Sequence, residues 1–419
     1  MVKRQVLPNG IRVIMQRMPE FRSVAMGAWI AAGAVYEQEQ EAGVSHFIEH
    51  MLFKGTQTRS AVEIAATMDG IGGNLNAFTA KECTCYYVKV LDEHIGVAVD
   101  VLSDMLLHPK LDPGDIEKEQ GVVCEEILMV QDTPEDLVHE MLASAMYENT
   151  PLSKPILGSQ QSVRVLTRES LQGYMNRHYC ADSIVIACAG NFEEEALIAL
   201  LSEKLQDGCG QRKSDMPEST LRTGRSFQAA EKDIEQVHIA MGLRGFAADT
   251  DQLYAMLILN NAFGGSMSSR LFQTIREERG LAYSVYSYPS SYNKTGYFAL
   301  YAGTGEKQAP EVVQLMLEEI EKLRRDGITK EEFTRSKEQL KGGYMLGQES
   351  TSARANAIGK SELLRGMVYT DEQIMARIER VSMDDVMDIL PEVLNLDNGA
   401  ASFVGRMSAQ AKQIEQMLQ

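Results

Sequence analysis

Several features that would place the sequence in a common class are missing from it. No Cys-x-x-Cys pair occurs, and the six cysteines are scattered along 419 residues, which favours free thiols in a reducing compartment over a disulfide framework. The longest uncharged apolar run, residues 23–36, is too short and too rich in glycine to span a bilayer. The first residues contain neither an apolar signal segment nor an amphipathic transit segment. We therefore expect a cytoplasmic protein with no membrane partner.

Positive charge is also in short supply. Lysine and arginine number 41 against 59 acidic residues, which gives a formal net charge of −18. A nucleic acid is excluded as the main partner, because phosphate contacts need a basic face. The charge is compatible with basic peptides as ligands, but a generic solvated acidic surface explains it equally well. With 44% apolar and 24% charged residues, the chain has an ordinary globular composition, and its length predicts at least two domains.

One short stretch has an unusual concentration of chemically active groups. Residues 46–50 read His-Phe-Ile-Glu-His inside an apolar segment with helical character. On a helix, His46, Glu49 and His50 lie within an arc of roughly 100°, while apolar side chains occupy the rest of the circumference. Burying two imidazoles and a carboxylate is costly unless a partner compensates, and two histidines four residues apart form a typical pair of metal ligands. The alternative is a pair of core histidines that are hydrogen-bonded to their neighbours.

A catalytic zinc site usually has three protein ligands, so a third must come from elsewhere. The other histidines are isolated in the sequence. An acid-rich helix, which we predict over residues 113–131, is a better source. Glu119 and Glu126 are seven residues apart and share a face of that helix, whereas Glu125 is turned about 100° away from Glu126. Spacing alone makes this pair a plausible ligand and helper, and a solvated acidic face is the competing interpretation.

The order of the expected elements repeats along the chain. The first half reads as a strand (23–32), the His/Glu helix (42–53), a short helix (60–69), a strand pair (74–91) and an amphipathic helix (94–107). The second half repeats this order at an offset of roughly 214 residues, with a strand near 237, then a helix from 250, a short helix (268–279), a strand pair (281–303) and a helix (308–325). Thr250 to Phe263, in the place of the His/Glu helix, contains neither His nor Glu.

We therefore predict an α+β fold of two homologous domains, each an antiparallel β-sheet covered by helices on one face. A polar stretch, residues 207–224, is the best linker, and the predicted domains are 1–213, with the metal site, and 214–419, which contacts substrate.

The spacing of these motifs resembles the pitrilysin/insulysin family of inverted zincins. Glu126 follows His50 by 76 residues, and Glu119 precedes Glu126 by seven. The length and the single motif are similar to the processing-peptidase branch, which includes the catalytic subunit of mitochondrial processing peptidase and bacterial single-chain relatives. The resemblance covers nearly the whole chain.

The resemblance implies a role for each motif residue. His46, His50 and Glu126 would bind Zn²⁺, and Glu119 would be a catalytic helper that holds the ligands in place. Glu49 would be the general base, which takes a proton from the attacking water and later returns it to the leaving amine.

Two further segments resemble substrate-binding elements of the family. Residues 72–79 look like its substrate-binding edge strand, and residues 276–283 look like its Arg-x6-Tyr element. The residues that would contact substrate are Asn76, Ala77, Phe78, Thr79, Arg276 and Tyr283. From the residues alone there are other interpretations. The first segment could be an ordinary internal strand, and Arg276 and Tyr283 are more often a helix-surface residue and a core aromatic.

In family members with four domains, the Arg-x6-Tyr element faces the zinc domain across a closed chamber. A two-domain chain thus implies a homodimer with composite active sites. The sequence as a whole predicts a zinc metalloendopeptidase that hydrolyses unfolded or presequence-like, extended and basic peptides. The alternative is a noncatalytic peptide-binding assembly subunit. A zinc-dependent small-molecule lyase is disfavoured by the duplicated domain and the extended edge strand.

Overall fold

The computed structural model describes residues 2–206 and 216–418. Within them the chain forms two compact units, and each is assembled from separate stretches of sequence. The first unit comprises residues 1–127, 154–217 and 346–370, and the second comprises 128–153, 218–345 and 371–419. The predicted boundary at 213/214 and Cys209 lie outside the described residues. Every helix of the described part is too short or too polar to cross a membrane.

The first unit is built on a mixed sheet. Its described strands, in spatial order, are β1 (Val2–Val6), β2 (Arg12–Arg17), β6 (Ile184–Gly190), β3 (Ser23–Ile30), β5 (Thr84–Leu91) and β4 (Asn74–Thr79). Neighbouring strands are antiparallel except β2 and β6, which are parallel. A hairpin forces its two strands to be antiparallel, but β6 follows β5 only after a long helical excursion and is free to run beside β2 in the same direction.

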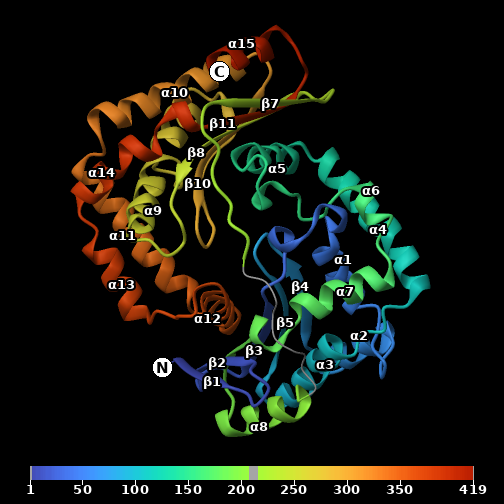
Figure 1. Ribbon diagram of the computed structural model, residues 1–419. Coiled ribbons are helices and arrows are strands. Elements are labelled where there is room, and N and C mark those ends of the chain that lie inside the picture. The colour runs from blue at the N-terminus through green and yellow to red at the C-terminus, as the bar shows by residue number, and fades with distance from the viewer. Residues whose placement is uncertain (1, 207–215, 419) are drawn as a thin grey trace. The chain divides into compact units, whose positions relative to one another are not determined.

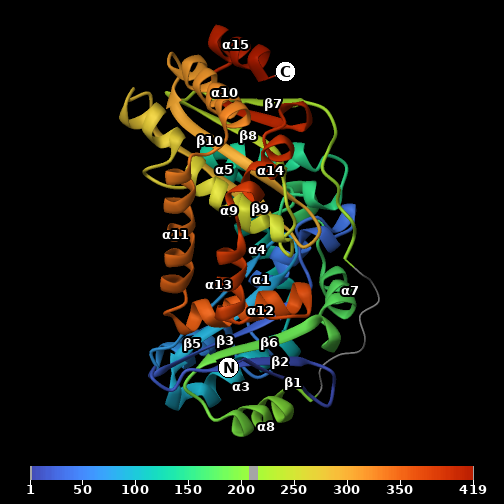
Figure 2. The same cartoon turned by 90° about the vertical axis from the view of Figure 1, so that its left-hand side faces the viewer.

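Helices cover both faces of this sheet, not one. The helices of the unit are α1 (Val44–Leu52), α2 (Ala61–Asp69), α3 (Ile95–Leu107), α4 (Pro113–Asp132), α6 (Gln160–Val163), α7 (Arg168–His178), α8 (Glu194–Lys204) and α12 (Thr351–Arg365). Figure 2 shows α12 on one side of β3 and β6, with α3 and α8 on the other. The main core lies on the side of α1 and α3, and a smaller core joins Trp29 and Val185 to Ile358 of α12.

Helix α12 reaches this sheet from the second half of the sequence, as its orange colour among blue and green strands shows (Figure 1). Gly359 permits the close approach, because a Cβ there would meet the Trp29 side chain at 2.3 Å. The buried carboxylate of Glu362 pairs with Arg4 at 3.0 Å and with Arg12 at 3.2 Å, so α12 is fixed to β1 and β2 by charge as well as by packing.

The second unit repeats the plan of the first. Its described strands, in spatial order, are β7 (Ser226–Glu231), β11 (Ala400–Gly405), β8 (Gln236–Gly245), β10 (Gly296–Gly305) and β9 (Ala282–Ser291). The order matches β2-β6-β3-β5-β4 strand for strand, and the single parallel pair, β7 with β11, occupies the corresponding place. This correspondence agrees with a duplicated domain.

Helices again cover both faces of the second sheet. They are α5 (Pro134–Met146), α9 (Asp251–Phe263), α10 (Ala309–Asp326), α11 (Lys330–Gly347), α13 (Asp371–Arg380), α14 (Met383–Val393) and α15 (Ala409–Leu418). Helix α5 comes from the first half of the sequence and packs on β11 and β8, where the Ser402 hydroxyl donates to the Val138 carbonyl at 2.7 Å. Figure 1 shows α5 on one side of these strands and α9, α10 and α14 on the other. The predicted α+β class is thus correct, with mixed sheets.

Candidate metal centre

Helix α1 presents the His/Glu motif from the wall of the first core. Its apolar side chains, Val44, Phe47, Ile48, Met51 and Leu52, are fully buried. They cover most of the circumference, so the remaining arc points the motif side chains to one side. The packing of these apolar side chains therefore fixes the position of the helix and the direction of the motif side chains.

The N-terminus of α1 is held by a residue that lies outside the helix, in the turns that precede it. The buried carboxylate of Glu37 accepts hydrogen bonds from the backbone N–H groups of Gly43 (2.8 Å) and Ser45 (2.9 Å). These groups lack partners within a helix, so the carboxylate caps the helix and complements its dipole. Burial raises the pKa of Glu37, although these hydrogen bonds oppose the shift. Gly43 has φ +90°, and a Cβ there would lie 2.5 Å from the Leu157 carbonyl oxygen.

Three side chains converge on one point. Nε2 of His46 and Nε2 of His50 each lie 3.6 Å from the same Glu126 oxygen, Oε2. All three candidate ligand atoms lie within 4.8 Å of one another. Tetrahedral ligands that are 2.0–2.2 Å from zinc are separated by about 3.4 Å. The His/His/Glu group therefore fits a zinc ion in both donor type and spacing.

The surroundings of the two imidazoles differ, and they decide which ring nitrogen is available to a metal. Burial, with a smaller contribution from His50, lowers the pKa of His46 to about 3, so this ring is neutral at pH 7. Burial would lower the pKa of His50 too, but Glu119, Glu126 and Glu49 raise it. Nδ1 of His50 lies 2.8 Å from Glu119 Oε1, and an ionised carboxylate can only accept, so Nδ1 bears the proton and Nε2 is left to bind a metal.

Glu119 is the best-enclosed carboxylate of the centre, at 3% exposure. Besides His50 it contacts the ammonium of Lys54, with Nζ 2.5 Å from Oε2. Burial would raise the pKa of Glu119, but the hydrogen bonds and charges of His50 and Lys54 outweigh it and lower the pKa. Glu119 is consequently held as a carboxylate that orients His50, an arrangement typical of residues behind a metal ligand.

Glu49 lies half-buried beside the three ligands. Burial raises its pKa, which brings it closer to the neutral range where a general base is most effective. Thr79, at the end of β4, opposes this shift by donating its hydroxyl to Glu49 Oε2 at 2.6 Å.

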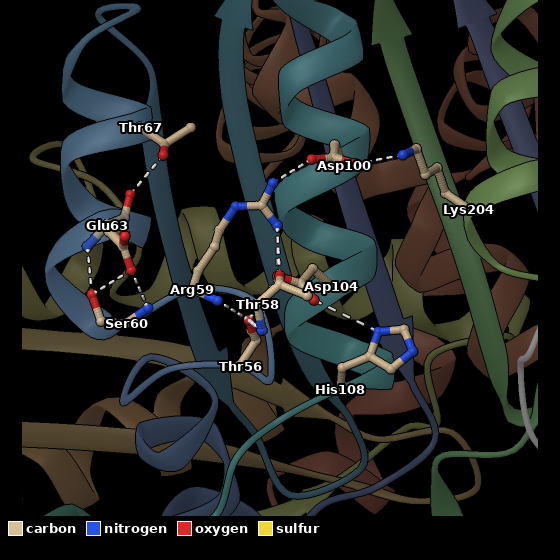
Figure 3. Close-up of polar contacts among 10 residues, drawn as sticks. All are labelled: Thr56, Thr58, Arg59, Ser60, Glu63, Thr67, Asp100, Asp104, His108 and Lys204. Carbon is tan, nitrogen blue, oxygen red and sulfur yellow. Dashed lines mark hydrogen bonds and ion pairs between the residues drawn. The ribbon is translucent and has the colours of Figure 1, made fainter.

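The loop that leaves α1 is fixed on α3 by a polar cluster. Asp104 is buried and accepts hydrogen bonds from the hydroxyls of Thr56 and Thr58, both at 2.7 Å, and from Arg59 at 2.6 Å (Figure 3). Arg59 also pairs with Asp100, which in turn pairs with Lys204 at 2.7 Å. The cluster anchors the loop that contains Lys54, and through Lys54 it supports Glu119.

The predicted substrate strand lies at an edge of its sheet. Strand β4 pairs only with β5 among the described strands, so one side of its backbone has no ladder partner there. The Asn76 side chain accepts from the Ala77 N–H at 2.8 Å, and the Phe78 ring packs edge-on against Trp29. The edge position removes the alternative of an internal strand, while the contact with a peptide remains a prediction.

Arg276 and Tyr283 lie in the second unit and contact each other. The guanidinium of Arg276 lies over the rings of Phe272 and Tyr283, with centroid distances of 4.8 and 4.4 Å, and donates to the Tyr283 carbonyl at 2.9 Å. The Tyr283 side chain is 76% exposed, so it is not a core aromatic. Part of the predicted helix 268–279 is a π-helix, Phe272–Glu277, a conformation that is frequent at functional sites.

Two contributors to the centre, Lys54 and Glu37, were not predicted from the sequence, and a third, Thr79, was predicted with a different role. Lys54 lies four residues after His50, two residues beyond the end of α1, so helical spacing offered a signal. Thr79 was expected to bind substrate only, yet its side chain contacts Glu49. No sequence pattern indicated that Glu37 would cap α1, because the turns between residues 37 and 43 decide where its side chain points.

The fold and this centre together define a class of protein, one with a candidate His/His/Glu zinc site on the first of two similar α+β units. Residues 12–160 match the model of the insulinase family, peptidase family M16, and residues 166–340 match that of the peptidase M16 inactive domain. The chain is 42% identical over 406 residues to the uncharacterized zinc protease YmxG of Bacillus subtilis, which covers 96% of this chain and 98% of that protein. An uncharacterized zinc protease of Mycobacterium tuberculosis is 39% identical, over 95% of this chain and 92% of its own.

The chain belongs to the M16 peptidase family. It carries a zinc protease domain and an inactive repeat of that domain, and its cofactor is zinc. Two solved structures share its fold at 18% identity. A crystal structure described as a peptidase M16 inactive domain from Pseudomonas fluorescens superimposes with a TM-score of 0.91 over 98% of this chain and 99% of that one. A protease from Helicobacter pylori superimposes with a TM-score of 0.89 over 97% and 99%.

Proposed function

We propose that this chain is a zinc metalloendopeptidase that cleaves extended, unfolded or presequence-like peptides. The observation that supports the proposal most strongly is the convergence of His46, His50 and Glu126 on one point, with Glu49 beside them. Three protein ligands leave a fourth position for water, which is the arrangement of catalytic zinc sites and not of structural ones.

In this proposal the residues of the chain divide the work among them. Zinc, when bound, lowers the pKa of water and polarises the peptide carbonyl. Glu49 accepts the proton of the attacking water and returns it to the leaving nitrogen, a task that its raised pKa favours. Glu119 keeps the proton of His50 on Nδ1, so that Nε2 stays available as a ligand.

Strand β4 is the proposed binding site for the peptide backbone. An extended peptide that pairs with a sheet edge is held mainly by main-chain hydrogen bonds, so it is read with little demand on sequence. Addition of a strand here requires the Asn76 side chain to release the Ala77 N–H. The net charge of −18 favours basic peptides as they approach.

Cleavage of a basic, unstructured peptide by the zinc-loaded protein tests the proposal. The wild type should cleave it, and Glu49→Gln should bind zinc at the same stoichiometry yet lose turnover, because glutamine cannot accept the proton. Glu203→Gln on exposed α8 is the matched control and should behave as the wild type. Absence of turnover in the wild type would support the alternative, a noncatalytic peptide-binding subunit, and full activity of Glu49→Gln would remove Glu49 from the base role.

We further propose that the enzyme is a homodimer in which Arg276 and Tyr283 of one subunit act with the zinc centre of the other. The exposed Tyr283 ring and the stacked Arg276 present a polar and aromatic surface suited to a peptide backbone. A mixture of Glu49→Gln and Arg276→Ala subunits tests this arrangement. If each variant is inactive alone, random mixing should restore about a quarter of the wild-type activity, since half of the dimers then have one intact site. No recovery on mixing would contradict a composite site. A cytoplasmic location remains a prediction from the sequence.

A further inference from the structure

The proposed base has a hydrogen-bond donor that belongs to the proposed substrate strand. The Thr79 hydroxyl lies 2.6 Å from Glu49 Oε2, within the range of 2.5–2.7 Å for a hydroxyl that donates to an ionised carboxylate. In the described part of the chain, no other group donates a hydrogen bond to the Glu49 carboxylate. The orientation of the Glu49 carboxylate in this structure therefore depends on Thr79.

We propose that Thr79 is a positioning residue for the general base, which it orients through its side chain while the strand that contains it holds the peptide. The inference rests on the proposed endopeptidase function. It differs from the predicted role of Thr79, which was contact with the substrate backbone.

The alternation of strand β4 explains why Thr79 faces the centre. Successive side chains of a strand point to opposite faces, so Leu75, Ala77 and Thr79 share one face. Leu75 and Ala77 pack on the core that contains α1, whereas Phe78 packs on the opposite face against Trp29. Thr79 is the member of this set that is close enough to α1 for a polar contact with Glu49.

Thr79 is the donor in its contact with Glu49, because an ionised carboxylate can only accept. The nearest other hydroxyl is that of Thr84, which faces Thr79 across the strand pair at 3.5 Å. Thr84 donates its proton to the Ala32 carbonyl at 3.0 Å, so toward Thr79 it could act only as an acceptor. The Thr79 proton points to Glu49 and not to Thr84, because the charged carboxylate is the stronger acceptor and lies at 2.6 Å against 3.5 Å. The β-branched side chain keeps the hydroxyl in place with little rotamer freedom to lose.

The contact connects substrate binding with catalysis. A peptide that pairs with β4 would be held by the backbone of the strand that ends at Thr79. The side chain of Thr79 orients Glu49, the proposed base. This arrangement keeps the distance from base to peptide constant. The constancy matters because a misplacement of about 1 Å can reduce a rate about 100-fold. Loss of the hydroxyl should therefore reduce the rate of the chemical step and leave peptide binding intact.

A pair of substitutions isolates the hydroxyl. Thr79→Val has the same shape without the donor, and Thr79→Ser keeps the donor. We expect Thr79→Val to lower kcat by about 10- to 100-fold, the range for a hydrogen bond to a charged group, with KM within about twofold of the wild type. Thr79→Ser should recover most of the lost kcat. Thr67→Val on α2, whose hydroxyl bonds to the Glu63 carbonyl, is the matched control for a threonine outside the centre (Figure 3).

Peptide affinity gives a second measurement that does not depend on turnover. In a Glu49→Gln background, addition of Thr79→Val should leave the Kd of an uncleaved peptide and the zinc content unchanged. A higher KM and a weaker Kd with unchanged kcat would overturn the inference and make Thr79 a substrate contact. A Thr79→Val enzyme with wild-type kcat, or a Thr79→Ser enzyme as impaired as Thr79→Val, would also overturn it.

Failure of this inference is distinguishable from failure of the proposed function. An inactive wild type would refute the endopeptidase and this inference together, whereas an active wild type with an equally active Thr79→Val refutes only the role of Thr79. If the valine variant does not fold, Thr79→Ala adds no bulk at the site and gives the same test.

Discussion

Replacement of Glu119 by glutamine should weaken zinc binding without disturbing the ligands themselves. Glutamine has nearly the same shape, and its carbonyl oxygen can still accept from Nδ1 of His50, so the imidazole keeps its orientation and its protonation. What is lost is the negative charge behind the ligand, together with the partner of Lys54. The substitution thus isolates electrostatics from geometry.

The size of the effect follows from the burial of Glu119. Residues behind a metal ligand are worth roughly 10- to 100-fold in metal affinity, and Glu119 is almost fully buried, so solvent screens its charge poorly. We expect Glu119→Gln to raise the zinc Kd by about 30-fold, or about 2 kcal/mol. A factor of about three in this rise of the zinc Kd comes from the ammonium of Lys54, which loses its partner. The factor is small because the Lys54 side chain is 37% exposed and can turn toward water.

The double variant Glu119→Gln/Lys54→Met removes both charges and separates these contributions. Its zinc Kd should lie about 10-fold above that of the wild type, so the double variant should bind zinc more tightly than Glu119→Gln alone. Competition with a chromophoric chelator at fixed pH measures each Kd, and Glu117→Gln, exposed on the same helix, is the control. Zinc binding by Glu119→Gln as tight as that of the wild type would contradict the role of Glu119, and weaker binding by the double variant than by the single one would contradict the role of Lys54.

Two further predictions concern the framework of α1. Hydrogen bonds from Thr58, Thr56 and Arg59 outweigh burial and lower the pKa of Asp104 below its ordinary 3.8, so its contribution to stability is present above that pH and is lost as pH falls through the lower folded value. Asp104→Asn should therefore lower the free energy of unfolding in urea by about 2–3 kcal/mol near neutral pH, and the difference from the wild type should narrow below pH 3.8. A difference in the free energy of unfolding that widens in acid would contradict the lowered pKa of Asp104. Gly43→Ala, at φ +90° and against the Leu157 carbonyl, should cost about 2 kcal/mol or more, and a neutral effect in the same assay would show that the turn relaxes freely.

The geometry of the centre could be anticipated because most of it is local. The side chains at 46, 49 and 50 share a helix face by periodicity, and those at 119 and 126 share another, so each helix presents its groups as a set. That the two sets meet is a long-range fact, which the resemblance to known peptidases implied and which the structure shows for His46, His50 and Glu126.

Other features depend on contacts that no local pattern encodes. Helix α12 packs on the first sheet and α5 on the second, each from the other half of the sequence, because Gly359 and Ser402 meet partners far along the chain. The hydrogen bond from Thr79 to Glu49 was within reach of strand alternation, but only once the helix was known to lie beside that face of β4. The parallel pair of β2 and β6 likewise depends on a chain path that turn residues do not reveal.

Anomalous diffraction at the zinc edge from crystals of the zinc-loaded protein tests the central claim most directly. We expect one ion per chain, about 2.0–2.2 Å from Nε2 of His46, Nε2 of His50 and an oxygen of Glu126. An ion bound elsewhere, or a Glu126 side chain turned away into solvent while zinc is bound, would contradict it.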